Sequence, residues 1–434
     1  MLPVILSAIG ATLTPEELTA AARVISTREN QGRGVYRVLD ELTGVLVEYH
    51  PYKNLVLTTP GGLAAGWSNA GVPNRYTATL VSQSKGLTNL GFLPGGDNSN
   101  ALGISSQGKT IVGAAEIGFN IYAFARTAAE GMVNLDVDPS FAIATAVSDD
   151  GRTVVGFGIT DGSFVCHRTD PAPPATTPLI NNVSFLPFLL DSTFSIATDV
   201  TRDGLIVVGC AYMTSPLPRS IFNATYHAYR WSQADGSEDL GLPVGATLAA
   251  ATGVSDDGNT ITGYFGHDDP INMPVLPSLM AWTNLQVTVE SEFVPFDTEP
   301  DIGAFIWKRI EGFPDTLTSI GLLPGGNSIY AAGISGDGKT IVGYGNTPVA
   351  THAFRWTEAE GVVDIGIPAG ASESAALAVS KNGDTIVGVC MTPSGRRPFI
   401  WRKAGGFVWP DLSAVPDISV LPGGAHSLAT CFSD

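Results

Sequence analysis

The sequence predicts an all-β fold built from repeated four-stranded sheets, and three observations support this prediction. An eleven-residue phrase recurs six times along the 434 residues. The copies follow one another at spacings that hold four short strands. Residues 426–434 match the first strand of one further repeat, and the strands that would complete it stand near the N-terminus. A repeated unit buries its faces against its neighbours, so the repeat defines the architecture.

Each copy of the phrase is predicted to form a β-hairpin. A strand of small residues ends at Ser or Thr, a turn centred on Gly follows, and a β-branched strand such as residues 340–342 leaves the turn. Gly tolerates the positive φ of such a turn, and a neighbouring Asp or Asn bonds the local backbone. β-Branched residues suit a pleated surface. The copies lie at residues 103–113, 146–156, 199–209, 253–263, 333–343 and 378–388.

A third and a fourth strand complete most repeats. The third, at residues 352–356, reads HAFRW and alternates aromatic with small or polar side chains. The fourth strand, at residues 362–366, follows a short turn. An LPGG linker such as residues 323–326 ends the unit. The shortest spacing between phrases indicates a unit of roughly 45 residues, which is the size of a β-propeller blade. Longer spacings indicate insertions at residues 170–193, 213–226 and 266–302.

The two ends of the repeat region are predicted to share one blade. Residues 63–69 resemble a second strand, and residues 77–91 match residues 352–366 at equal length. Six complete blades and this composite one give a seven-bladed β-propeller over residues 59–434. Joining the N- and C-terminal strands in the closing blade removes the exposed edges that an open array would leave.

Residues 1–58 are predicted to form a short N-terminal helical arm. Thr14 is a good N-cap and begins a capping box, which predicts a helix over about residues 14–27. Leu18 and Ile25 share its apolar face. So short a helix is not stable alone, and we expect it to dock on the propeller or on a partner. Two strands in a possible hairpin follow at residues 45–48 and 54–58.

Composition excludes several function classes. The net charge of −18 argues against nucleic acid, whose binders present basic patches, and against anionic membranes. We expect no membrane insertion, because no transmembrane helix is present. The apolar start, residues 1–13, lacks a basic region, so we expect no conventional secretion signal. The four Cys follow no metal spacing and are expected to be buried small residues; whether any of them pairs stays open.

These motifs, taken together, resemble the HAF repeat family, named for the His-Ala-Phe that stands here at residues 352–354. The resemblance covers nearly all of residues 63–434. It implies a β-propeller, often in an extracellular setting. It implies no agreed activity and no catalytic residues. Residues 164–168 depart most from the pattern, and the fourth strand of that repeat is not recognisable.

Candidate interaction residues lie where the repeat is interrupted. The insertion at residues 266–302 is apolar, and an apolar insertion either packs on the propeller or forms an interface. The residues that we expect at protein interfaces, in the arm and in the insertions, are Leu18, Ile25, Phe188, Leu276, Met280 and Trp282. They predict protein partners and leave a homo-oligomer open.

One acidic segment is a weak calcium candidate. Asp297, Glu299 and Asp301 stand at alternate positions, as in calcium loops, but the full EF-hand pattern is absent. A solvated acidic loop is the other interpretation. No other cofactor is expected. The repeated Asp-Asp-Gly sequences are interpreted as turns.

Three functional hypotheses follow. The first is a non-catalytic structural or interaction protein that assembles into a larger particle such as a bacteriophage tail or virion. It depends on the absence of a secretion signal, the docking arm and the apolar insertions. The second is an exported bacterial cell-surface adhesin or glycan-binding propeller, located outside the cell or on its surface. The third is a propeller glycan hydrolase or lyase, which would need two close carboxylates in a central polar pocket.

Overall fold

The structure is a computed structural model. It describes residues 29–30, 36–40, 45–49, 63–68, 77–82, 86–105, 108–169, 180–213, 225–266, 302–392, 395–408 and 428–433. Every named element within these ranges is a β-strand, as an all-β fold requires. The predicted helix over residues 14–27 lies outside them. Within the described part of the chain, no helix has the length and apolarity that crossing a membrane requires.

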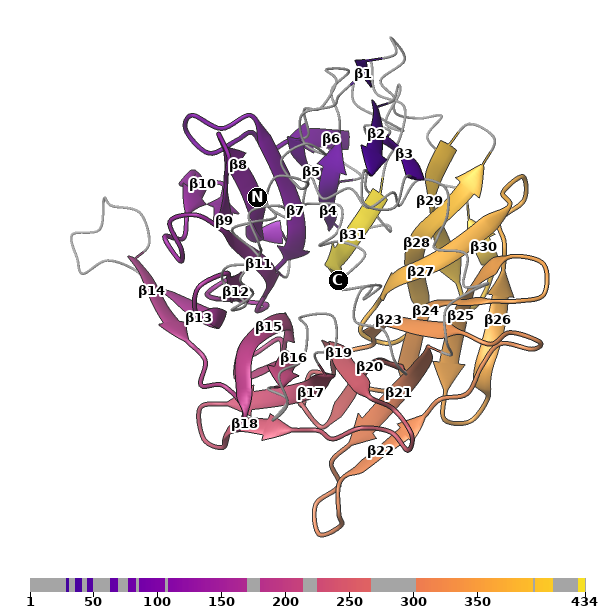
Figure 1. Ribbon diagram of the computed structural model, residues 1–434. Coiled ribbons are helices and arrows are strands. Elements are labelled where there is room, and N and C mark those ends of the chain that lie inside the picture. Colours follow the sequence, from indigo (N-terminus) through magenta and orange to yellow (C-terminus); the bar gives the residue numbers. More distant parts are fainter. Residues whose placement is uncertain are drawn as a thin grey trace.

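Four-stranded antiparallel sheets of consecutive strands account for much of the described chain (Figure 1). Each joins the hairpin of one phrase to the two strands that follow it. The strands of four such sheets are β7 (Asn98–Ile104), β8 (Thr110–Ile117), β9 (Asn120–Thr127) and β10 (Gly131–Asn134); β11 (Ala142–Val147), β12 (Thr153–Gly158), β13 (Gly162–Thr169) and β14 (Ile180–Phe185); β23 (Ile329–Ile334), β24 (Thr340–Asn346), β25 (Thr351–Thr357) and β26 (Gly361–Gly366); and β27 (Glu373–Val379), β28 (Thr385–Thr392), β29 (Gly395–Arg402) and β30 (Gly406–Val408).

Two further sets of four strands are linked, because the third strand of one set pairs with the first strand of the next. One residue pair, Tyr226 with Leu248, links them in parallel and makes one eight-stranded sheet. Antiparallel pairs connect the strands within each half. The strands are β15 (Ser192–Val200), β16 (Ile206–Met213), β17 (Thr225–Ser232) and β18 (Gly236–Asp239), followed by β19 (Leu248–Val254), β20 (Thr260–Gly266), β21 (Gly303–Lys308) and β22 (Thr316–Ser319).

The strand nearest the C-terminus completes a sheet of N-terminal strands. β31 (Leu428–Ser433) pairs antiparallel with β4 (Leu63–Ser68), and β5 (Thr77–Ser82) and β6 (Gly86–Asn89) complete the sheet. The sequence predicts this sharing. β3 (Val45–Tyr49) occurs as predicted, but it pairs with β2 (Tyr36–Asp40), which pairs in turn with β1 (Glu29–Asn30). The partner predicted for β3, residues 54–58, lies outside the described residues.

The first strands of the sheets surround a common axis (Figure 1). Each first strand contacts the first strand of the next sheet, and β31 contacts both β7 and β27. The strands in this inner layer are β7, β11, β15, β19, β23, β27 and β31. This arrangement of radial four-stranded sheets is a β-propeller.

Close packing explains the last Gly of each phrase. A Cβ on Gly343 would overlap the carbonyl oxygen of Tyr330 on the first strand and would lie 2.8 Å from Cε1 of Phe354 on the third. Gly263 and Gly388 meet the corresponding carbonyl and aromatic ring in their own sheets. The aromatic residue of the third strand therefore lies flat against the second strand only where Gly leaves room for it.

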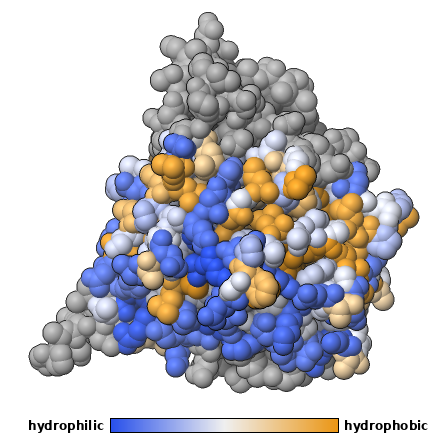
Figure 2. All heavy atoms as spheres, turned by 90° about the horizontal axis from the view of Figure 1, so that it is seen from below, coloured by the Kyte–Doolittle hydropathy of each residue, from blue (hydrophilic) through white to orange (hydrophobic). Residues whose placement is uncertain are grey.

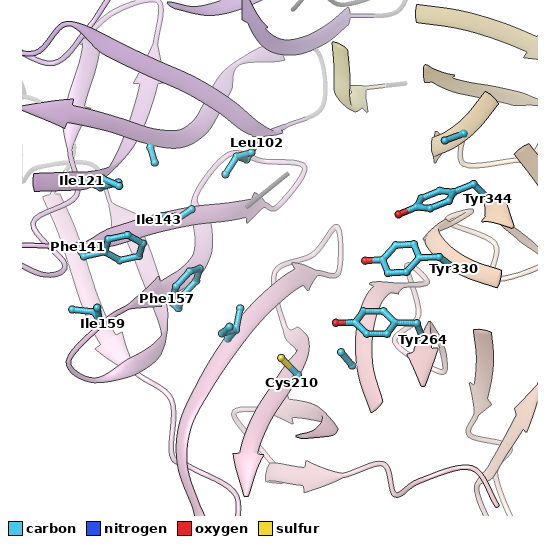
Figure 3. Packing of buried hydrophobic residues seen from close by; sticks show 14 of the residues in the cluster. Leu102, Ile121, Phe141, Ile143, Phe157, Ile159, Cys210, Tyr264, Tyr330 and Tyr344 are labelled. Atoms are coloured by element: carbon cyan, nitrogen blue, oxygen red, sulfur yellow. The ribbon is translucent and has the colours of Figure 1, made fainter. Parts of the chain in front are cut away.

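The core lies between neighbouring sheets and around the axis. One cluster packs Ile306 of β21 against Ile329 of β23 and Phe354 of β25, so it joins two consecutive sheets face to face. A separate central cluster takes residues from the first and second strands of several sheets, including Ile143, Phe157, Tyr264, Tyr330 and Tyr344 (Figure 3). Burial of these apolar faces stabilises the sheets at about 25 cal/mol per Å².

Segment 170–193 is not a simple insertion between repeats. Its residues 180–185 form β14, the fourth strand of its sheet, which the sequence pattern did not reveal. Leu186 and Leu189 then enter the core between this sheet and the next. The other predicted insertions, 213–226 and 266–302, fall between second and third strands, and their central residues 214–224 and 267–301 lie outside the described ranges.

The two ends of the strands differ in surface chemistry. The phrase turns, which carry many charged residues, lie where first strands end, and the loops that precede first strands lie at the opposite end. Phe119, Leu190, Val244 and Val349 are exposed in loops at this second end. In the view of Figure 2, hydrophobic residues are more frequent in the upper part of the described surface and hydrophilic residues in the lower part.

Candidate functional site

The phrase turns share one hydrogen-bond pattern. The Ser148 hydroxyl donates to Oδ1 of Asp150 at 2.6 Å, and the Arg152 N–H donates to the same oxygen at 2.9 Å. Gly151 lies between them at a φ of 74°. The same Ser/Thr-to-Asp bond occurs at 2.6 Å in the turns of Asp203, Asp257 and Asp337. These carboxylates accept hydrogen bonds within the turn, as expected from the interpretation of the Asp-Asp-Gly sequences as turns.

The residue that precedes this Asp differs from turn to turn. Neighbouring turns are hydrogen-bonded to each other at this residue: the Asp149 N–H donates to the Arg202 carbonyl at 2.8 Å, and the Asp256 N–H donates to the Gly336 carbonyl at 2.9 Å. The Asp337 N–H, in turn, donates to the Lys381 carbonyl at 3.1 Å. The variable residues are therefore brought together at the turn end of the inner strands.

Their side chains form a network of ion pairs. Arg202 Nε lies 2.8 Å from Oδ1 of Asp256, and its Nη1 lies 3.4 Å from Oδ2 of Asp149. Lys381 Nζ lies 2.7 Å from Oδ2 of Asp256, although the turn that contains Gly336 lies between the turns of Lys381 and Asp256. Gly336 makes this reach possible, because a Cβ there would be 2.6 Å from Oδ1 of Asp256.

A fifth residue, Asp199, adds an unusual carboxyl group beside this network. The other phrases carry only Gly or Ala at its position. Its Oδ1 accepts the Val200 N–H at 2.9 Å, and its Oδ2 accepts the Val254 N–H of β19 at 3.0 Å. We call Asp149, Asp199, Arg202, Asp256 and Lys381 the turn cluster.

Burial raises the pKa of Asp199 to about 6. The two backbone N–H groups and Arg202 lower this pKa, and the negative charge of Asp256 raises it, but burial is the largest influence. Asp199 can therefore hold or release a proton near neutral pH, next to a carboxylate that is paired with two cations. The arrangement suits general acid–base chemistry on a polar substrate.

Other ionisable groups connect strands within a sheet or are buried in the core. His227 Nδ1 lies 2.7 Å from Asp239 Oδ2, and His352 lies at the same distance from Asp364, so the repeated His ties the third strand to the end of the fourth. Cys166, Cys210 and Cys390 are buried, as predicted. Burial raises the pKa of the Cys166 and Cys210 thiols to about 12, which argues against a nucleophilic role.

The residues predicted from sequence for binding are not brought together in the described structure. Phe188 is 42% exposed, while its neighbours Leu186 and Leu189 are buried. The other predicted interface residues and the calcium candidates lie outside the described ranges; they are Leu18, Ile25, Leu276, Met280, Trp282, Asp297, Glu299 and Asp301. Within those ranges, no group of three or more His, Cys, Asp or Glu side chains is placed to hold a metal ion.

No protein-family model and no curated protein matches the chain. Similar solved structures include the β-propeller domain of the trilobed protease from Pyrococcus furiosus, with 14% identity, a TM-score of 0.48, and 83% of this chain and 96% of that one covered. An oligogalacturonate lyase from Vibrio parahaemolyticus has 11% identity and a TM-score of 0.43, with 82% and 85% covered. An acylaminoacyl peptidase from Pyrococcus horikoshii has 12% identity and a TM-score of 0.46, with 84% and 53% covered.

These comparisons contradict the expectation of a non-catalytic particle component. Several of the similar solved structures are enzymes, among them an oligogalacturonate lyase, the tricorn protease, a prolyl endopeptidase and an acylaminoacyl peptidase. The same comparisons contradict the prediction that the chain is not an enzyme. At identities of 8–14%, these proteins do not define a reaction for this chain, which has to be argued from its own residues.

Proposed function

We propose that the chain is a β-propeller hydrolase or lyase that cleaves glycans at the turn cluster. One observation carries the proposal. Asp199, a partly buried carboxyl with a pKa near 6, lies within electrostatic reach of Asp256, which is itself paired with Arg202 and Lys381. Two carboxyl groups in different environments are the arrangement that glycoside cleavage requires.

The proposed roles follow from these environments. Hydrolysis and β-elimination both break a glycosidic C–O bond, and the leaving oxygen needs a proton in each case. Protonated Asp199 supplies that proton. Asp256 is the second carboxylate and acts as the base: in hydrolysis it takes a proton from the water that attacks the anomeric carbon, and in β-elimination it takes the proton from the carbon next to a uronate carboxylate. Arg202 and Lys381 fix the orientation of Asp256 from two sides. The same two cations are available to anionic groups of a substrate.

The finer features of the fold belong to the same proposal. We infer a closed ring of seven blades, supported by the pairing of β31 with β4 and by the contacts of β31 with β7 and β27. We place the protein outside the cell or on its surface, where glycans are plentiful, in keeping with the HAF repeat resemblance. No resident cofactor is proposed, and the net charge of −18 argues against nucleic acid as a partner.

The proposal is tested with purified protein and a panel of neutral and uronate-containing polysaccharides. Two assays run in parallel, one for new reducing ends and one for the ultraviolet absorbance of unsaturated products. We expect activity on at least one substrate and a loss of about 100-fold or more in Asp199→Asn and Asp256→Asn, since general acid–base catalysis contributes on this scale. Asp384→Asn is the matched control, because this exposed carboxylate also belongs to a phrase turn.

Two outcomes would overturn the proposal. Activity that survives both turn-cluster substitutions would place the chemistry elsewhere. Saturable glycan binding without any cleavage would favour the glycan-binding alternative from the sequence analysis. Thermal unfolding of every variant, followed by circular dichroism, separates loss of activity from loss of fold.

A further inference from the structure

A set of cross-strand pairs surrounds the propeller axis. In each of the six sets of four strands that carry a phrase, the residue three positions before the phrase pairs with the residue directly after it. We call these twelve residues the central ring; the pairs are Asn100 with Ala114, Ile143 with Phe157, Ile196 with Cys210, Ala250 with Tyr264, Tyr330 with Tyr344, and Ala375 with Val389. Every member except Asn100 belongs to the central hydrophobic cluster.

Asn100 is the polar exception, and one of its atoms is unsatisfied. The residue is 3% exposed, and its Oδ1 has no hydrogen-bond partner among the described residues. Ile143 and Ile196 occupy the same place in other sheets, so packing alone does not call for an amide here. A buried acceptor without a partner is destabilising, which favours a role in contacting a bound molecule.

Three hydroxyl groups face the axis from two other sheets. The rings of Tyr264 and Tyr330 are stacked with centroids 4.8 Å apart, and Tyr330 and Tyr344 follow at 5.1 Å. Figure 3 shows their hydroxyl groups pointing in one direction, away from their strands and toward the opposite side of the ring. The strand of Asn100, β7, lies across the axis from β19 and β23, which begin the two tyrosine-bearing sheets (Figure 1).

The remaining surroundings are aromatic and uncharged. Phe194 packs edge-on against Phe157 with centroids 6.3 Å apart and against Tyr212 at 5.5 Å. Phe194 and Tyr212 are only partly buried and lie at the edge of the cluster, whereas Tyr264, Tyr330 and Tyr344 are buried within it. The central ring contains no charged side chain among its twelve members, and an ionic ligand would therefore lose its hydration without compensation.

We propose that the central ring binds a neutral polyhydroxylated molecule, such as an uncharged sugar ring. The Asn100 amide and the hydroxyl groups of Tyr264, Tyr330 and Tyr344 bond its hydroxyl groups, and aromatic carbon contacts its apolar faces. This site shares no residue with the turn cluster. It stands independently of the proposed glycan cleavage.

The test measures binding rather than catalysis. Methyl α-D-glucopyranoside and methyl α-D-galactopyranoside are the neutral probes, sodium galacturonate is the charged probe, and calorimetry or saturation-transfer NMR reports binding. We expect at least one neutral probe to bind saturably and galacturonate to bind more weakly. Asn100→Leu and Tyr330→Phe should each weaken binding about tenfold, the effect of one lost hydrogen bond.

Matched controls locate the site. Tyr122→Phe removes a hydroxyl that contacts Asn120 on β9, outside the central ring, and should leave binding unchanged. Asp199→Asn should also leave it unchanged, which separates this site from the turn cluster. Asn100→Leu is expected to fold, because two of the equivalent positions hold Ile, and its melting temperature checks this. No saturable binding, binding that persists in both ring variants, or galacturonate binding as tight as that of the neutral probes would each overturn the proposal.

Discussion

At the residue scale, the phrase divides its positions between structure and chemistry. Ser148 and Asp150 are fully engaged in the turn, and Gly156 is required by the close approach of the first strand. In the described turns, the side chain of the residue after the Ser or Thr makes no hydrogen bond within the turn. Residues as different as Asp149 and Lys381 can therefore occupy this position. Asp199 is different again, because it replaces Gly or Ala at a position that the turn does not use.

The raised pKa of Asp199 predicts a pH-dependent contribution to stability. Its pKa is about 6 in the folded protein and 3.8 in its ordinary state, so folding binds the proton more tightly. The free energy of unfolding attributable to this group therefore falls as pH rises from about 4 to about 6, by up to about 3 kcal/mol. We expect the free energy of unfolding of the wild type, relative to that of Asp199→Asn, to be lower at pH 8 than at pH 4 by up to this amount. Urea unfolding of both chains at the two pH values measures it.

The two chains differ only at Asp199, so titrations of the other groups are common to both and cancel in that comparison. If the difference between the wild type and Asp199→Asn is independent of pH, Asp199 does not have a raised pKa. Its proposed role as a proton donor would then lose its basis.

Activity should follow the same titration. A proton donor works only while protonated, so the proposed glycan cleavage depends on Asp199 below its pKa of about 6. We expect kcat/KM to fall as pH rises through this value in the wild type. A profile that rises through pH 6 would instead make Asp199 a base, and the pH–rate profile of the purified enzyme decides between the two.

At the element scale, each sheet depends on one glycine in its second strand. Gly343 lies under the ring of Phe354, and a side chain there would collide with the Tyr330 carbonyl. The collision involves backbone, which has no room to move without breaking the pairing of β23 with β24. The aromatic residue of the third strand and the glycine of the second are thus one packing unit, although they stand eleven positions apart in sequence.

Replacing this glycine should therefore be costly. We expect Gly343→Ala to lower the free energy of unfolding by about 3 kcal/mol, as for an overpacked core, measured by denaturant unfolding. Gly405→Ala is the control, because a Cβ on Gly405 meets nothing within 4 Å and its φ is not in the left-handed region. Equal stability of the two variants would mean that the close approach at Gly343 is relieved by small shifts.

The sequence predicted those elements whose structure depends on residues that are close together along the chain. The hairpin turns, the second strands and the composite sheet were predicted because Gly, Asp and β-branched residues act through their immediate neighbours. β14 was missed because residues 180–185 lack the alternating pattern of the other fourth strands and follow an irregular segment. The turn cluster was missed because Asp256 and Lys381 meet only through the stacking of separate repeats. The one sequence signal for Asp199 was its departure from Gly or Ala.

At the scale of the whole molecule, the composite sheet connects the two ends of the repeat region. β31 pairs with β4 along its length and contacts the first strands on both sides. Removing it would expose the pairing edge of β4 and the faces of two neighbouring sheets, and exposed strand edges promote association.

Truncation tests this connection directly. We expect a chain that ends at residue 427 to show a lower melting temperature and a concentration-dependent mass by light scattering. Removing only Asp434, which follows β31, should change neither property. A truncated chain with the melting temperature and mass of the full chain would argue against a closed ring.

The pairing of β31 with β4 also constrains the order of folding. The other sheets join strands that follow one another in sequence, so each can form after closing only short loops. The composite sheet must bring together segments separated by most of the chain, and the entropy of that closure is recovered only when the sheets between them are already in place. We therefore expect the composite sheet to form last, and until it forms the faces of the neighbouring sheets that pack against β31 stay exposed.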